Sequence, residues 1–226
     1  MNMYKLFISL SLILCFSYPI RSQNTYESTK NNTEKKRMEF DAKYKSSQTD
    51  AERQTVIDEA RNFLLKDIDN YFDAWYGTQW DFNGHTRTPK NGKIACGYFI
   101  TTILSDMGFN IPRIKWAQMA SEGMILKMTT DIKRFRKTPM SEIVNYIKNK
   151  GEGLYVVGLD CHVGFIYYHD KQMRFVHSNY YRPQIGVMSE NLIGRNPLND
   201  SKYRVIGKIL DDNMVKKWIT GVNWGS

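Results

Sequence analysis

Three residues of the sequence, Cys96, His162 and His177, have the chemical types that nucleophilic catalysis by a thiol requires. A thiol attacks a carbonyl when its thiolate is stabilised and a neighbouring base removes its proton, and imidazole is a common base for this step. A single cysteine at the start of an apolar helix is more often a buried packing residue, so Cys96 needs such a base. His162 supplies the base, and His177 supplies a ring that can orient it.

A helix is predicted to begin at Cys96. Apolar residues follow at helical spacing, and Gly108 is a suitable C-terminal stop. The positive end of the helix dipole would then lie beside the sulfur. The small neighbours Ala95 and Gly97 would let a substrate carbonyl approach the backbone N–H groups of the first turn. This segment therefore predicts a thiol next to an oxyanion-binding helix N-terminus.

The two histidines are predicted to lie on neighbouring strands. His162 begins an alternating run and His177 ends the next run, so an antiparallel turn would bring the two rings together. A disulfide between Cys96 and Cys161 is the structural rival. Adjacent strand residues point to opposite faces, so a His162 that faces Cys96 predicts that Cys161 faces away. Asn179, two residues beyond His177, is the alternative orienting residue, a substrate-binding candidate, or simply a turn former.

The order of the elements predicts an α+β domain over residues 50–226, because helices come first and strands follow. The segment from 75 to 92 contains glycine, proline and aromatic residues without periodicity, and is interpreted as a long functional loop. Trp80 in this loop would line a cleft or pin the loop. Further helical segments are expected within residues 112–150. Strands are predicted over residues 154–158, 161–168, 173–178 and 203–210.

The N-terminal residues 1–22 have the order of a secretory signal peptide, with Lys5 before an apolar run from Leu6 to Phe16. This run is shorter than the roughly 20 residues that span a bilayer, which argues against the alternative of an uncleaved anchor. We therefore expect a secreted or periplasmic protein without stable membrane insertion after signal cleavage. Residues 23–49 are polar and are predicted to form a linker, because they have little apolar surface to offset the entropy of ordering.

The composition gives weaker indications of partners. The formal net charge is +9, but basic and acidic residues are mixed, and no basic helix or aromatic platform typical of nucleic-acid binding is visible. We expect no nucleic-acid partner and a monomeric protein. The cysteines and histidines lack paired CxxC or HxxxH spacing, so no metal site is predicted.

Three segments carry a family resemblance, in this chain order: Ile94-Ala95-Cys96-Gly97-Tyr98-Phe99, Cys161-His162-Val163-Gly164-Phe165-Ile166-Tyr167 and Arg174-Phe175-Val176-His177-Ser178. They resemble the papain-like bacterial cell-wall peptidases and amidases of the NlpC and CHAP type. Those enzymes combine a cysteine at the start of a buried helix with a His-x-Gly strand and a further polar residue on the next strand.

The resemblance implies a papain-like fold, with Cys96 as nucleophile, His162 as general base and acid, and His177 as the orienting residue. It also implies hydrolysis of amide bonds in peptidoglycan peptides or another peptide substrate, without a metal or an organic cofactor. The family commonly has a Tyr-Gly segment upstream of the nucleophile, so Tyr76 would line the cleft or help to bind the oxyanion. Ala95 departs from the aspartate that the family usually has before the cysteine. The alternative function is a non-catalytic secreted binding module on the same scaffold.

Overall fold

The computed structural model describes residues 18–225, with side chains from residue 25 onward. The first 17 residues of the predicted signal peptide lie outside the described residues. The helices are α1 (Tyr18–Ser46), α2 (Asp50–Trp75), α3 (Cys96–Asp106), α4 (Arg113–Ala117), α5 (Ser121–Met128), α6 (Met140–Lys150), α7 (Pro197–Asp200) and α8 (Asp212–Ile219). The strands are β1 (Ile132–Arg136), β2 (Gly153–Leu159), β3 (Val163–His169), β4 (Gln172–Asn179), β5 (Gly186–Glu190) and β6 (Tyr203–Lys208).

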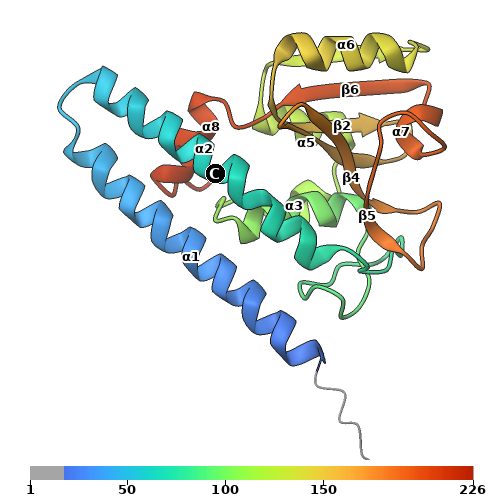
Figure 1. Cartoon of the computed structure of the whole chain (residues 1–226), viewed down its shortest axis with the longest axis horizontal. Coiled ribbons are helices and arrows are strands. Elements are labelled where there is room, and N and C mark those ends of the chain that lie inside the picture. The colour runs from blue at the N-terminus through green and yellow to red at the C-terminus, as the bar shows by residue number, and fades with distance from the viewer. Residues whose placement is uncertain (1–17, 226) are drawn as a thin grey trace, which may run out of the picture.

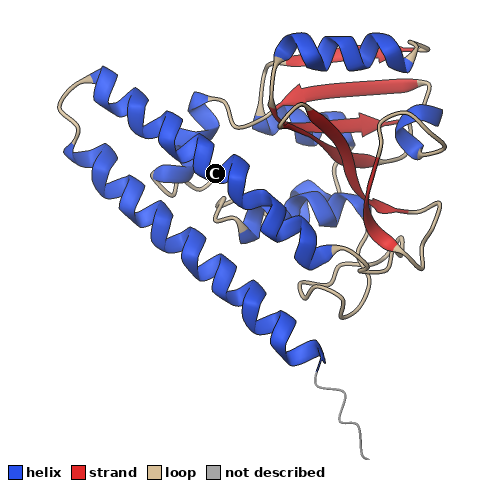
Figure 2. Cartoon of the chain, viewed as in Figure 1, coloured by secondary structure: helices blue, strands red, loops and turns tan. Residues whose placement is uncertain are grey.

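The strands form one antiparallel sheet in the order β1-β6-β2-β3-β4-β5 (Figure 1). Strands β2 to β4 follow one another as a meander, as predicted, β5 continues it, and β6 inserts between β1 and β2. Helices and an antiparallel sheet together confirm the α+β class (Figure 2).

The sheet is buried on both faces, because its strands alternate apolar side chains between two clusters. On β3, Phe165 and Tyr167 face the larger cluster, which also holds residues of α2, α3, α5 and α8. Ile166 lies between them in sequence and faces the smaller cluster, formed with α6 and α7. Helix α6 accordingly lies over the opposite side of the sheet from α3 (Figure 1).

Helix α1 corrects the prediction of a polar linker over residues 23–49. It runs as a 29-residue helix alongside α2, and its inner face carries Tyr26, Thr33 and Phe40 at intervals of seven residues. Tyr26 and Thr33 are buried, and the Thr33 hydroxyl donates to Asp67 on α2 at 2.7 Å and accepts from the Tyr71 hydroxyl at 2.7 Å. On α1, hydrogen bonds between buried polar groups take the place of a continuous apolar face, so the sequence pattern did not indicate a packed helix.

Two edge strands, β1 and β5, were not predicted from the sequence. Strand β1 reads Ile-Lys-Arg-Phe-Arg and buries only Phe135, so charge obscures its alternation. Charged residues on an edge strand are common, because they discourage pairing with another chain. Within residues 18–225, no helix has both the length and the apolar character needed to cross a membrane.

Candidate active site

Cys96 is the first residue of α3, as the sequence predicts. The N-cap residue Ala95 makes no side-chain capping bond, so the first-turn N–H groups are left to other partners. Gly97 also has a packing role, since a Cβ at this position would lie 2.3 Å from the carbonyl oxygen of Ala117. The glycine therefore allows α4 to pack against the start of α3, and this contact fixes where the helix begins.

The thiol of Cys96 is largely enclosed, and burial raises its pKa. The backbone N–H groups of Val163 and Gly97 lie against the sulfur and act in the opposite direction. Burial has the larger effect, so the resting residue is a neutral thiol rather than a thiolate. This differs from the stabilised thiolate that the helix N-terminus alone would suggest.

His162 lies immediately before β3 and is only 4% exposed. Its Nε2 atom is 2.8 Å from Nδ1 of His177, and its Nδ1 atom is buried without a hydrogen-bond partner among the described residues. Burial, with a smaller contribution from His177, lowers the pKa of His162 well below its usual range. The neutral form of the ring is therefore favoured, with one nitrogen hydrogen-bonded and the other without a partner among the described residues.

His177 is fully buried on β4, and its ring makes two side-chain contacts besides that with His162. One is a stacked arrangement with Phe175, with ring centroids 4.1 Å apart. The other joins its Nε2 atom to Oε2 of Glu190 on β5 at 2.9 Å. Gly164 on β3 makes this packing possible, because a Cβ there would lie 2.4 Å from the Phe175 ring and 3.0 Å from Cβ of His177. The predicted pairing of the two histidines is thus present, with Glu190 as an unpredicted third member.

Two cavities adjoin Cys96 and His162, and both residues line both cavities. The first, about 810 Å³, is the aromatic cavity, and its other lining residues include Trp80, Phe82, His85, Tyr98 and Tyr180. The second, about 620 Å³, is the polar cavity, and its other lining residues include Ser121, Glu122, Arg136, Asp160 and Tyr203. A chain-like ligand lying over the sulfur could therefore extend to either side of it.

No family model, curated protein or solved structure matches this chain. The likeness to cell-wall peptidases therefore rests on the motifs and their order.

The orientation predicted for Cys161 is wrong. Asp160 and Cys161 form the turn between β2 and β3, with the Leu159 N–H donating to the His162 carbonyl at 2.8 Å, so strand alternation does not apply to them. Cys161 is exposed, and it lines both cavities together with Cys96 and His162. Both cysteines are nevertheless free thiols.

The three predicted substrate contacts have different outcomes. Trp80 lies in the loop after α2 and lines the aromatic cavity. Tyr76 lies outside both cavities, beside Ser189 and Arg174, because α2 ends at Trp75 and the chain turns there toward β5.

Asn179 is also outside both cavities, because its side chain is turned into the protein. It is fully buried, and its Oδ1 accepts from the Tyr181 N–H at 2.8 Å. Its Nδ2 lies 3.4 Å from Oε2 of Glu190. Asn179 forms a turn and supports Glu190, and it does not touch His162.

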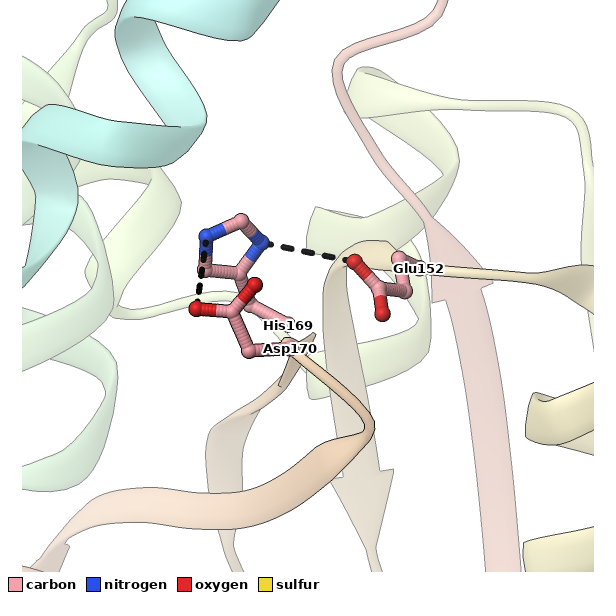
Figure 3. A group of neighbouring side chains, drawn as sticks. All are labelled: Glu152, His169 and Asp170. Carbon is pink, nitrogen blue, oxygen red and sulfur yellow. Dashed lines mark ion pairs between the residues drawn. The ribbon is translucent and has the colours of Figure 1, made fainter.

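A second group of ionisable residues lies at the hairpin between β3 and β4 (Figure 3). His169 stands between Glu152 and Asp170, with Nδ1 3.5 Å from a Glu152 oxygen and Nε2 3.7 Å from an Asp170 oxygen. Each ring nitrogen of His169 faces its own carboxylate. This group has no contact with the cavities beside Cys96.

Proposed function

We propose that this protein is a papain-like cysteine hydrolase of amide bonds, with peptidoglycan peptides as its substrate class. The observation that carries the proposal is the buried Nδ1 atom of His162, which has no hydrogen-bond partner among the described residues, in a residue that lines the same two cavities as Cys96. A base with one free lone pair and a nucleophile with one proton are the two groups that acyl transfer needs.

The reaction would begin with a neutral pair. As Sγ of Cys96 attacks the carbonyl carbon, its proton passes to Nδ1 of His162. The N–H groups of the first turn of α3 stabilise the oxyanion. His162 then gives the proton to the leaving amine, and a thioester remains on Cys96. Water attacks the thioester while His162 accepts a proton from it, which releases the acid and restores the thiol.

The two cavities support a substrate that continues on both sides of the cleaved bond. Trp80 and Tyr180, with rings 6.0 Å apart, offer the aromatic cavity's flat apolar surfaces. The polar cavity presents the guanidinium of Arg136 stacked on Tyr203 at 4.7 Å. An internal amide of a peptide that carries charged groups fits this arrangement, which favours peptide and isopeptide bonds over small amides.

The second candidate function, a non-catalytic binding module, is favoured by the raised pKa of the Cys96 thiol. Many reactive cysteines have a lowered pKa, because the thiolate is the stronger nucleophile. Proton transfer to His162 during the attack removes the need for a thiolate at rest, so we retain the hydrolase as the proposal. Export is proposed with it, on the signal-like order of residues 1–22.

Replacement of Cys96 by alanine tests the function. Hydrolysis of peptidoglycan fragments, followed by mass spectrometry, should fall by roughly a million-fold, as when the nucleophile of a catalytic triad is removed. Ser105→Ala, near the other end of α3, is the matched control and should hydrolyse normally. Both variants should unfold at the temperature of the unmodified protein. Undiminished hydrolysis by Cys96→Ala would exclude the mechanism, and binding of fragments without hydrolysis by the unmodified protein would favour the binding module.

A further inference from the structure

Glu190 was not singled out by the sequence, yet its side chain contacts His177 of the candidate site. It is the last residue of β5, paired in register with Phe175, and its side chain is 13% exposed. Its Oε2 atom lies 2.9 Å from Nε2 of His177, and Nδ2 of Asn179 lies 3.4 Å from the same oxygen. The carboxylate therefore stands behind His177, on the far side from His162.

We propose that Glu190 is a positioning residue, which fixes the tautomers of both histidines so that the free nitrogen of His162 carries a lone pair. The inference deepens the proposed function, and it can be measured without any substrate.

The direction of each hydrogen bond follows from the carboxylate. An ionised carboxylate only accepts hydrogen bonds, so Nε2 of His177 must carry a proton. A neutral ring has one N–H, so Nδ1 of His177 is an acceptor. Nε2 of His162, 2.8 Å away, must then donate to it, and Nδ1 of His162 is left without a proton.

Burial favours the neutral form of both rings. Burial lowers the pKa of His177 as well as that of His162, although Glu190 opposes the shift at His177. Three arginines, Arg174, Arg182 and Arg195, line the surface pocket that also contains Glu190. Of these arginines, Arg174 is also ion-paired with Asp69.

Without Glu190, the bond between the two histidines can run in either direction. In the reverse direction Nδ1 of His177 donates to Nε2 of His162, and the proton of His162 moves to Nδ1. A protonated Nδ1 cannot accept a proton from the thiol, so that tautomer is inactive. The carboxylate thus acts through two rings on an atom that it does not touch.

The test is to replace Glu190 and read the tautomers directly. In protein labelled with ¹⁵N-histidine, long-range proton–nitrogen NMR spectra distinguish Nε2–H from Nδ1–H rings. We expect Nε2–H for both His162 and His177 in the unmodified protein. Glu190→Met keeps the length of the side chain but removes the acceptor, and a population of Nδ1–H His162 should appear. Hydrolysis of peptidoglycan fragments should fall by about tenfold or more.

Two further variants separate positioning from packing. Glu190→Gln keeps an acceptor oxygen and the shape of the side chain, so it should retain most of the Nε2–H form. Glu152→Gln changes the glutamate that faces His169 at 3.5 Å on the exposed hairpin (Figure 3), and it should alter only the His169 signals.

The outcomes separate this inference from the proposed function. Unchanged tautomers in both Glu190 variants, or Nδ1–H His162 in the unmodified protein, would overturn the role of Glu190. Such a result would leave the dependence of hydrolysis on Cys96 untouched. Conversely, hydrolysis that survives Cys96→Ala would defeat the hydrolase while the tautomer assignment could still hold.

Discussion

Gly97→Ala tests whether the start of α3 is held by its contact with α4. The new Cβ would lie 2.3 Å from the carbonyl oxygen of Ala117 and 3.2 Å from its carbon, and both are backbone atoms. Backbone atoms of a helix cannot move aside as the end of a flexible side chain can. Overpacking of this kind typically costs about 1–3 kcal/mol. Since about 1 kcal/mol corresponds to about 2–4 °C in a chain of this length, the melting temperature should fall by about 2–12 °C.

Gly123→Ala is the matched control, because this glycine also lies in the first turn of a helix, α5. Its Cβ would meet only the terminal methyl of Met119, at 3.4 Å. Alanine is favoured over glycine in helices by about 1 kcal/mol, so this variant should be unchanged or slightly stabilised. Differential scanning calorimetry of both variants provides the measurement. Equal melting temperatures would refute the account of Gly97, because the two substitutions differ only in what the methyl group meets.

Two further predictions concern pH and helix α1. The pKa of His162 is lowered and that of Cys96 is raised, so both residues should stay neutral over a wide pH range. In a profile of kcat/KM against pH, the acid limb from His162 should lie below about pH 6.5, and the alkaline limb from Cys96 should lie above about pH 8.5. A pH profile whose acid limb lies above 6.5 would contradict a neutral His162. Thr33→Val removes a hydroxyl that bonds both Asp67 and Tyr71, and should lower the free energy of unfolding in urea by about 1–3 kcal/mol. An unchanged urea midpoint would indicate that α1 contributes nothing to the domain.

Regular apolar spacing made α2, α3 and the β2–β4 meander predictable from the sequence. Helix α2 begins with a capping box, in which the side chains of Thr49 and Glu52 each bond the other's backbone N–H. The spacing of these two residues is visible in the sequence. Cys96 and the pair of histidines were predictable for the same reason, since each lies at the end of such an element. The spacing of apolar residues, and the points where that spacing ends, were sufficient to predict these elements and residues.

The features that were not predicted depend on the turns and long-range contacts of the folded chain. Glu190 ends an edge strand that has little alternation, and its partner His177 is found only when β4 and β5 are aligned. Cys161 lies in a turn of two residues, where the rule of alternating faces no longer holds. Helix α1 buries polar groups whose partners lie 34 and 38 residues away along the chain. A pattern among neighbouring residues cannot reveal contacts between groups so far apart in the sequence.

The insertion of β6 between β1 and β2 also governs the order in which the protein can fold. Among the described strands, β1 pairs with β6 alone, so it has no strand neighbour until residues 203–208 are available. The meander β2–β5 can form earlier from local hairpins, and would present β2 as an open edge during that time. Closing this edge requires contacts between distant parts of the chain, which form slowly. A nascent or newly unfolded chain is therefore most vulnerable to aggregation at β2, and the strand synthesised last protects it.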